Sequence, residues 1–586
     1  MCAPVSSFVV SPFLQLKRRF IPKAVLHKLI EHGLDPVLAR VFAARGVQNA
    51  QELGYTLANL PDFSRLKGAR ELAWRLWQAI EKKERIVVVA DYDADGATAC
   101  AVAIRGLRTL GATIDFIVPD RMKHGYGLTP DIVELATQLA PNLLLTVDNG
   151  IASVDGVREA ARRGIDVLIT DHHLPGAELP TPAIIVNPDQ PDCPFPLKHL
   201  AGVGVMFYVL TALRALMREN NASRANTLNL AALLDLVALG TIADVVQLDH
   251  ANRILVAQGL SRIRSGKAHP GIRALFSVSG KATASADAFD LGFAAAPRLN
   301  AAGRLADMSL GIRCLIADDP KEALRLATEL DELNHARRSV EADIQQEALA
   351  EIQNLDEQKF VDQYTLCVAK PEWHPGVIGI VASRLKERFH RPTIVFGSAD
   401  QGEFSDELRG SGRSIAGLHM RDALDSIVKR APHLIHKFGG HAMAAGLTIY
   451  RKDFAEFCCL FEEVARENLS QEQLCQIVES DGELTDDDLT YTLAQTLRNQ
   501  VWGQGFPVPV FDNIFSVTQQ IIIKEKHSRL TLSLNGKSFD AMLFGDTTPL
   551  PSQIHAAYHV KTREYQELQS LQLIITHWWH VQKTED

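Results

Sequence analysis

Residues 86–100 read IVVVADYDADGATAC, in which an apolar run is followed by three aspartates at alternate positions and then by a glycine. The apolar run is short and rich in valine, which is typical of a buried strand. An EF-hand calcium loop also begins D-x-D-x-D-G, but it follows a helix and has glutamate at its twelfth position, which is Val102 here. The stretch therefore predicts a strand that ends in carboxylates, with a solvated turn as the alternative; these carboxylates are Asp91, Asp93 and Asp95.

Apolar strands and amphipathic helices alternate from about residue 85 to residue 190. This order predicts an α/β fold with a mostly parallel sheet and helices on its faces. Such sheets bind ligands beyond the carboxyl ends of their strands. We expect strands at Ile86–Ala90, Thr113–Val118, Asn142–Val147, Asp166–Thr170 and Ala183–Val186, and helices near 97–109, 130–139 and 153–163.

Polar residues directly follow the expected strands. A single aspartate at such a place is often a helix N-cap, but four of the five strand ends carry one, and a histidine pair accompanies them. A functional site at this edge of the sheet explains the set better than capping does. The residues are Asp91, Asp93, Asp95, Asp120, Arg121, Asp148, Asn149, Asp171, His172, His173 and Asn187.

The apolar segment Leu230–Val246 has helical spacing and carries two acids, Asp235 and Asp244. Burying an acid costs free energy unless it is paired or binds a metal. Carboxylates together with imidazoles suit Mg²⁺ or Mn²⁺ better than structural zinc. The number of candidate ligands exceeds the need of one ion, so we expect two ions and in-line displacement at phosphorus, with basic groups near the phosphate oxygens.

The chain has 586 residues, 46% of them hydrophobic and 22% charged, so we expect several globular domains. No apolar run reaches the ~18 residues of a membrane span, and the N-terminal charge order is not that of a signal peptide, so we expect a cytoplasmic protein. Eight scattered cysteines without a CxxC pair argue against a zinc ribbon.

The net charge of −9 does not suggest a nucleic-acid binder. Residues 370–452, however, hold 13 Lys and Arg against 8 Asp and Glu, and we expect phosphate contacts in that segment.

The remaining chain shows three further patterns. A highly charged helical stretch from Lys321 to Leu355 is typical of a connector, and a second α/β unit follows at about 360–452, with strands near Tyr364–Val368 and Thr393–Phe396. Strand-like runs after residue 480 predict a small β-barrel. These runs are Val510–Lys524, Arg529–Asn535, Ser538–Phe544 and Leu571–Trp579.

Four segments stand in the order of the motifs of the DHH phosphoesterase superfamily, which the chain resembles: DYDADG (91–96), TVDNG (146–150), ITDHH (169–173) and LGTIADVV (239–246). Other segments narrow the resemblance to the RecJ family of bacterial single-strand-specific DNA exonucleases: RMKHGYGL (121–128), NPDQPDCPFPLKHLAGVGVMFYVL (187–210), PRLNAAGR (297–304), EWHPGVIGIVASRL (372–385), RGSGRS (409–414), FGGHAMAAG (438–446) and WGQGFPVPVF (502–511). The resemblance covers about residues 50–580. It implies an N-terminal helical segment (1–75), a DHH catalytic domain (76–250), a helical region with a connector helix (251–355), a DHH-associated domain (356–455) and an OB-fold nucleic-acid-binding domain (465–580).

The resemblance implies hydrolysis of single-stranded DNA from the 5′ end to mononucleotides, in recombination and repair, with two Mn²⁺ or Mg²⁺ ions. The implied metal ligands are Asp91, Asp93, Asp95, Asp148, His172 and Asp244. His173 is expected to touch the scissile phosphate, and Asp171 to orient a histidine. The sequence leaves open which histidine of the pair binds metal, and whether Asp91 binds it directly or only shapes the turn.

The resemblance also implies a set of DNA contacts. Ser411 and Arg413 stand on a glycine-rich loop that suits a phosphate, and Gly439–His441 is expected to line a cleft between the two α/β domains that admits a single strand but not a duplex of ~20 Å. The barrel is expected to bind the strand by stacking and charge, although the acidic stretch Glu479–Asp488 leaves its binding face open. The expected DNA-binding residues are Arg121, Tyr126, Arg298, Asn300, Arg304, Ser411, Arg413 and His441.

The implied partners are single-stranded DNA, a single-strand-binding protein and a repair helicase, for a monomeric protein with no membrane contact. Two other functions compete with this one. The first is another DHH activity, on pyrophosphate, cyclic dinucleotides or very short oligonucleotides, and the second is a non-catalytic DNA-binding relative. The length of the chain and its full set of metal ligands favour the exonuclease.

Overall fold

The computed structural model describes residues 14–119, 126–353, 362–398, 406–565 and 568–581. The chain divides into two compact units. One combines the N-terminal stretch up to Arg18 with His335–Glu479, and the other combines Arg19–Asn334 with Ser480–Asp586. The division falls within the longest helix, α14 (Pro320–Gln353), which lies where the charged connector was expected.

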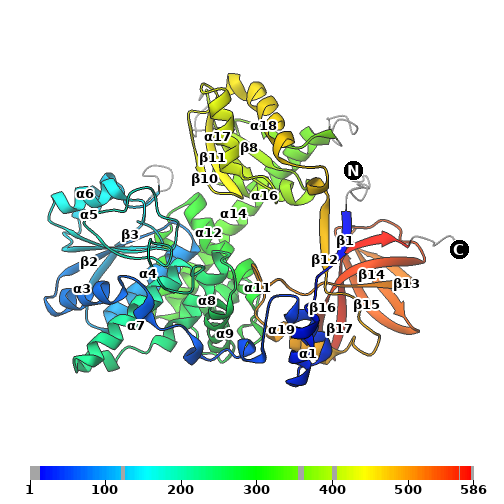
Figure 1. The fold of residues 1–586 in the computed structure, drawn as a ribbon, viewed down its shortest axis with the longest axis horizontal. Coiled ribbons are helices and arrows are strands. Elements are labelled where there is room, and N and C mark those ends of the chain that lie inside the picture. Colours follow the sequence, from blue (N-terminus) through cyan, green and yellow to red (C-terminus); the bar gives the residue numbers. More distant parts are fainter. Residues whose placement is uncertain (1–13, 120–125, 354–361, 399–405, 566–567, 582–586) are drawn as a thin grey trace. The chain divides into compact units, whose positions relative to one another are not determined.

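The larger unit contains a five-stranded sheet in the order β3-β2-β4-β5-β6, and every neighbouring pair is parallel (Figure 1). The five predicted strands are confirmed to within one residue at each end. They are β2 (Arg85–Ala90), β3 (Thr113–Ile117), β4 (Leu143–Val147), β5 (Asp166–Thr170) and β6 (Ile184–Val186).

Helices cover both faces of this sheet, which explains why its central strands β2 and β4 are buried at nearly every position. Successive side chains of β2 point to opposite faces: Ile86, Val88 and Ala90 belong to one core, and Val87 and Val89 to another. In Figure 1, α5 and α6 lie above the sheet, and α3 and α7 lie below it. The bounds are α3 (Ala69–Glu81), α4 (Ala94–Thr109), α5 (Pro130–Thr137), α6 (Val154–Arg162) and α7 (Gly202–Glu219).

The strand order reverses beside β2, because its neighbours β3 and β4 lie on opposite sides of it. The chain therefore leaves β2 toward one side of the sheet and returns as β4 on the other. Such a reversal opens a crevice at the carboxyl ends of the two strands, where open α/β sheets bind their ligands. The residues after β2 and β4 border this crevice.

Helices fill the chain between the sheet and the long helix. The predicted helix at 230–246 is present as a 3₁₀ turn, Leu230–Leu233, and α8 (Leu234–Ala243). Two short helices, α1 (Lys23–Glu31) and α2 (Pro36–Ala43), precede α3. The others are α9 (His250–Arg264), α10 (Pro270–Val278), α11 (Ala288–Asp290), the π-helical turn η7 (Leu291–Ala295), α12 (Ala296–Leu305) and α13 (Ser309–Ile316). No helix among the described residues is both long enough and apolar enough to cross a lipid bilayer.

The closed barrel predicted for the C-terminal region is present in the same unit, in the order β13-β14-β15-β17-β16. Four of its strands coincide with the predicted runs: β13 (Phe511–Ile523), β14 (His527–Leu534), β15 (Lys537–Phe544) and β17 (Leu568–His580). The sequence did not indicate β16 (Gln553–Tyr565). Its central residues, HAAYHVK, combine alanine and charge with few β-branched residues, and pairing along β17 sets its conformation instead. Helix α19 (Tyr491–Asn499) precedes the barrel.

The smaller unit contains the second predicted α/β domain. Its sheet has the order β10-β11-β9-β8-β7, in which β7 and β8 are parallel and the other pairs antiparallel. The strands are β7 (Leu366–Ala369), β8 (Thr393–Ser398), β9 (Glu407–Arg413), β10 (Lys437–Gly440) and β11 (Ala444–Tyr450). They pack with α16 (Ile378–Phe389), α17 (Met420–Arg430) and α18 (Phe454–Asn468), and β1 (Leu14–Arg18) pairs with β12 (Gln476–Ser480).

Candidate metal centre

The DYDADG segment forms the turn between β2 and α4. Asp93 is the N-cap of α4, and its Oδ1 accepts hydrogen bonds from the backbone N–H groups of Asp95 and Gly96, at 2.9 and 3.0 Å. The Asp95 carboxylate accepts two more, from the backbone N–H groups of Gly202 (2.5 Å) and Val203 (3.0 Å) at the start of α7. These bonds fix the direction of both carboxylates.

Three further side chains reach the same place from other elements. Asp148 follows β4 with a left-handed backbone (φ +62°), His172 follows β5, and Asp244 is the C-cap of α8. The Nε2 atom of His172 lies 3.0 Å from Oδ1 of Asp148 and 3.5 Å from Oδ2 of Asp244. The acid of the predicted helix therefore meets the residues of the sheet edge.

The side chains form three overlapping groups, and within each group the candidate ligand atoms lie within 4.8 Å of one another. Asp148 and His172 each belong to two groups, which is the arrangement expected when adjacent ions share ligands. All the predicted metal ligands are included, and so is His173. The groups are Asp91, Asp93 and Asp148; Asp95, His172 and Asp244; and Asp148, His172 and His173.

Ionisation of the clustered acids is unfavourable in the absence of a cation. Burial, and then the neighbouring carboxylates, raise the pKa of Asp95 to about 7 and raise the pKa values of Asp91, Asp148 and Asp244 well above the ordinary range. Burial lowers the pKa of His172 to about 4, so this ring is neutral near pH 7. A neutral imidazole among acids that resist ionisation is a ligand set that a divalent cation would stabilise.

Two buried atoms support the fit of a cation. Oδ1 of Asp148 and Nε2 of His172 are only 3.0 Å apart, but neither forms a hydrogen bond with the other or with another described residue, although both are shielded from solvent. The His172 ring also interacts with the backbone of Leu200, and its Nε2 faces the carboxylates of Asp148 and Asp244. Buried polar atoms rarely lack partners in proteins, and a shared metal ion would satisfy both.

His173 is held differently from His172. Its Nδ1 lies 2.8 Å from Oδ1 of Asp171, which also accepts hydrogen bonds from the backbone of both histidines. Burial acts to lower the pKa of His173, but the hydrogen bond and charge of Asp171 raise it above its ordinary value. Asp171 thus has the orienting position predicted for it. The hydroxyl of Tyr126 donates to the backbone carbonyl of Asp148 at 3.1 Å and lies 3.2 Å from Nδ1 of His173, so Tyr126 borders the centre.

Helix α12 carries the PRLNAAGR segment against the same turn. Oδ1 of Asn300 accepts the backbone N–H of Ala94 at 2.8 Å, and a Cβ atom at Gly303 would lie 1.8 Å from the carbonyl oxygen of Tyr92. Arg298 is only 6% exposed, and its guanidinium is 2.7 Å from Asp331. The structure therefore brings Asn300 to the DYDADG turn but places Arg298 in an internal ion pair.

The other predicted DNA contacts lie elsewhere in the chain. Ser411 and Arg413 are on β9 of the smaller unit, where Nη1 of Arg413 donates to the Ser411 hydroxyl at 3.0 Å, and His441 follows β10 of the same unit. Arg304 is half-buried near the end of α12. Arg121 and Asp120 lie outside the described residues.

Gly202 was not predicted as part of the site. A Cβ atom there would lie 2.5 Å from Cβ and 2.6 Å from Oδ1 of Asp148, so only glycine permits this approach. The available signal was the AGVG sequence at 201–204, directly before a long apolar helix. Small residues at a helix start allow another chain segment to approach its N–H groups closely.

A sheet crevice bordered by these overlapping acid and histidine groups is the arrangement of a DHH-type phosphoesterase. Residues 85–241 match the DHH family, N-terminal domain; residues 362–467 match the DHHA1 domain; and residues 480–577 match the RecJ OB domain. The chain belongs to the RecJ family.

Similar proteins extend over nearly the whole chain. The single-stranded-DNA-specific exonuclease RecJ of Dickeya dadantii is 47% identical, over 96% of this chain and 99% of its own, and that of Escherichia coli is 44% identical, over 97% and 99%. The crystal structure of RecJ from Thermus thermophilus in complex with Mn²⁺ superposes with a TM-score of 0.81 at 29% identity, over 98% of this chain and 80% of that one. A second structure of that protein, in complex with Mg²⁺, gives a TM-score of 0.74 at 27% identity, over 98% and 79%.

Proposed function

We propose that this protein is a metal-dependent exonuclease that hydrolyses single-stranded DNA from its 5′ end and releases 5′-mononucleotides. The observation that carries the proposal is the set of overlapping ligand groups that share Asp148 and His172. The proteins named RecJ that it resembles support the substrate, and the Mn²⁺ and Mg²⁺ complexes of the Thermus thermophilus protein support the cofactor.

The proposed ligands are Asp91, Asp93, Asp95, Asp148, His172 and Asp244. Divalent ions bound there would supply positive charge to the phosphate oxygens and would lower the pKa of an attacking water. Asp93 and Asp95 hold their directions through backbone N–H bonds, so the ligand set needs little rearrangement to bind ions. Of the two histidines, we propose His172 as the metal ligand, because its Nε2 faces two carboxylates.

His173 has a separate role in this proposal. The Asp171 carboxylate binds Nδ1 of His173 and raises the pKa of the ring, so the ring can carry a second proton and a positive charge. Its other nitrogen, Nε2, is not bound by Asp171. A positively charged imidazole at the edge of the metal centre would donate a hydrogen bond to a non-bridging oxygen of the scissile phosphate. The Tyr126 hydroxyl restrains the ring as well, at 3.2 Å from Nδ1 and 3.3 Å from Nε2.

The decisive experiment compares two aspartate variants with the wild-type protein on a single-stranded oligonucleotide with Mn²⁺. Asp93→Ala removes a proposed ligand and should abolish mononucleotide release. Asp115→Ala is the matched control, because Asp115 lies on β3 of the same sheet with a half-exposed side chain and belongs to none of the ligand groups. Wild-type rates in the Asp93→Ala variant would refute the metal assignment.

The polarity of digestion needs its own test. We propose that Ser411 and Arg413 bind a phosphate of the strand, which is supported by the Arg413 guanidinium standing beside the Ser411 hydroxyl on a glycine-rich strand. Blocking the 5′ end of the oligonucleotide with a bulky protein should stop digestion, whereas the same block at the 3′ end should not. Equal sensitivity to both blocks would contradict 5′ polarity.

The finer expectations from the sequence stay proposals. They are a monomeric state, binding of a single-strand-binding protein and a repair helicase, a cytoplasmic location, a role in recombination and repair, and the boundaries of the five predicted parts. Light scattering of the purified protein tests the first, and titration with purified single-strand-binding protein tests the second.

A further inference from the structure

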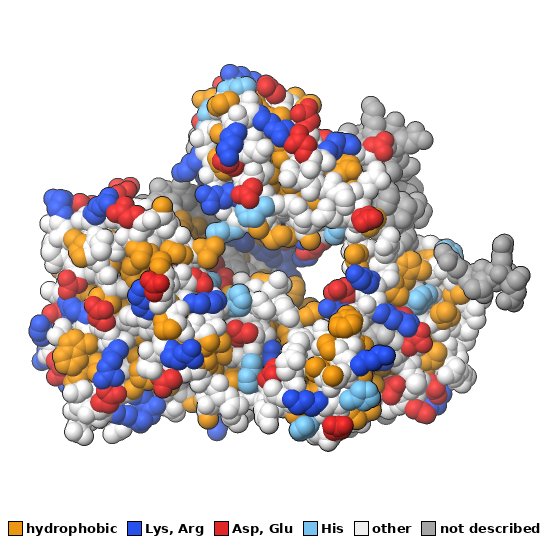
Figure 2. Space-filling model, in the orientation of Figure 1, with side chains coloured by type: hydrophobic (Ala, Val, Ile, Leu, Met, Phe, Trp, Pro, Cys, Tyr) orange, Lys and Arg blue, Asp and Glu red, His pale blue; other side chains and the backbone are white. Residues whose placement is uncertain are grey.

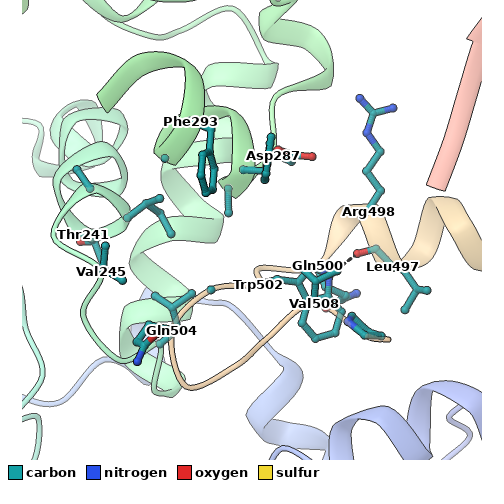
Figure 3. Close-up of a pocket in the computed structure, with 18 of the residues that line it drawn as sticks. Thr241, Val245, Asp287, Phe293, Leu497, Arg498, Gln500, Trp502, Gln504 and Val508 are labelled. Carbon is teal, nitrogen blue, oxygen red and sulfur yellow. Dashed lines mark hydrogen bonds between the residues drawn. The ribbon is translucent and has the colours of Figure 1, made fainter. Parts of the chain in front are cut away.

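The larger unit contains a cavity of about 420 Å³ that the catalytic proposal does not use. Its walls come from three stretches of chain, at 241–248, 287–293 and 497–509, together with Val560 and Lys561 of β16. The volume falls in the range of ~300–1,000 Å³ that is usual for ligand pockets. Figure 3 shows the Phe293 ring extending from the helical side, with Thr241 and Val245 on one flank and Trp502 on the segment that leads to the barrel.

Two aromatic rings form an exposed platform at this cavity. Phe289 and Phe293 stack with centroids 4.3 Å apart and an interplanar angle of 21°, yet they are 55% and 60% exposed. The π-helical turn η7, which contains Phe293, interrupts the helix between α11 and α12. Such turns occur frequently at functional sites, and an apolar exposed pair beside a pocket marks a binding surface.

The platform is connected to the metal centre in two ways. The cavity wall includes Val245, which directly follows the proposed ligand Asp244. The helical run that carries Phe293 continues without a break into α12, where Asn300 binds the DYDADG turn. The platform therefore has a fixed position relative to the proposed metal ligands.

Charge near the cavity favours an anionic ligand. Lys561 lies on the barrel side, is half-buried and makes no ion pair with any residue that the structure describes. Arg498 also lines this side, where it donates to the Ser285 carbonyl (3.0 Å) and to the Thr562 hydroxyl (3.2 Å). The acid at the cavity, Asp287, is engaged as the N-cap of α11. Elsewhere on the face in Figure 2, basic and acidic side chains are interspersed, so charge alone does not mark a path for DNA.

We propose that this cavity binds a base of single-stranded DNA next to the cleavage site, stacked on Phe293 and Phe289, with Lys561 near the phosphate backbone. The inference rests on the proposed function and adds a subsite to it. Aromatic faces combined with basic groups are the usual means of binding single strands, and because every base has a π face, the subsite would show little base preference.

The test uses the full-length protein in EDTA, so that DNA binds without being cut. An oligonucleotide carries 2-aminopurine at successive positions from its 5′ end, and stacking on an aromatic ring changes the fluorescence of this base. We expect a strong change at one or two adjacent positions, its loss in Phe293→Ala, and its recovery in Phe293→Trp. Affinity should fall by about five- to a hundred-fold for the lost stack.

Trp74→Ala is the matched control, because Trp74 is an exposed aromatic (46%) on α3, outside the cavity. It should leave affinity and fluorescence as in the wild type. With Mn²⁺ present, Phe293→Ala should slow digestion of a 20-nucleotide strand more than that of a trinucleotide.

Two results overturn the proposal. If Phe293→Ala retains both the position-specific signal and wild-type affinity, DNA does not stack there, and the platform then suits another partner such as a protein. If the wild-type protein neither binds nor cuts single-stranded DNA, the proposed function fails first and the subsite fails with it.

Discussion

Metal binding at the acid cluster should be coupled to proton release, and Asp95 sets the size of the effect. With a pKa of about 7, this buried carboxyl carries a proton in ~0.9 of metal-free molecules at pH 6 and in ~0.1 at pH 8. A metal ion binds the carboxylate form, so binding must displace the proton. Asp95 alone therefore predicts release of ~0.9 proton at pH 6 and ~0.1 at pH 8, and the other acids, whose pKa values are also raised by burial, add to both values.

Isothermal titration with Mn²⁺ in two buffers of different ionisation enthalpy measures this number directly. The affinity for Mn²⁺ should rise about fivefold from pH 6 to pH 7 through Asp95. Asp95→Asn, which keeps the shape but cannot ionise, should reduce the release at pH 6 by nearly one proton. Equal proton release at pH 6 and pH 8, or an unchanged release in the variant, would refute this reasoning.

The same carboxyl sets the sign of the pH dependence of stability. In the metal-free protein its pKa is higher in the folded chain (about 7) than in the unfolded chain (3.8), so the folded state binds the proton more tightly and stability falls as pH rises from about 4 to about 7. The loss is on the order of 4 kcal/mol at pH 8. Mn²⁺ should offset it, so its stabilising effect against urea should be larger at pH 8 than at pH 5.

Three further substitutions test other parts of the structure. Gly202→Ala should displace the Asp148 carboxylate, since the added Cβ would lie 2.5 Å from that side chain, and should lower the rate of DNA hydrolysis at least ~10-fold with the fold intact. Asp171→Asn removes the charge that raises the pKa of His173, so the NMR titration midpoint of this ring should move to lower pH. His269→Ala removes the ring that lies 2.9 Å from the fully buried Asp235, which keeps a backbone N–H and the more distant Arg262, and should cost about 2 kcal/mol of unfolding free energy in urea.

Two of these substitutions have a matched control, and the third has a result that would contradict it. Gly176→Ala adds a methyl group in open space and should leave hydrolysis unchanged. His32→Ala removes an exposed histidine and should leave the unfolding free energy within ~0.5 kcal/mol of wild type. An Asp171→Asn protein in which His173 titrates as before would show that the carboxylate does not control the ring.

The sequence predicted the sheet and the acidic edge that holds the candidate ligands, because both depend on local signals. A run such as IVVVA is apolar at every position only when helices cover both faces, and the residues after such a run must lie at the carboxyl edge. Asp91, Asp148 and His172 were found by that rule. Asp235 and Asp244 were both recognised as costly acids, and the family resemblance selected Asp244 as a ligand. The structure gives the physical difference between them: Asp235 pairs with His269, and Asp244 joins the metal groups.

The rest depended on contacts between distant segments. The Arg298–Asp331 ion pair has no local pattern, and the AGVG segment around Gly202 does not indicate which side chain approaches it, because each contact is defined by a partner far along the chain. The missed strand β16 has weak strand propensity and is formed by pairing with β17. The Phe289–Phe293 platform was missed because two phenylalanines four residues apart on a helix usually belong to a core.

The left-handed backbone of Asp148 disfavours folding, although the proposed function requires an aspartate at this position. Most residues other than glycine are strained in this backbone region. Aspartate is strained less than most residues, and glycine and asparagine adopt the region most readily. The buried charge adds to the penalty. A library sorted for folding stability alone would therefore enrich Asp148→Asn and Asp148→Gly, and would discard the ligand shared by both proposed ions.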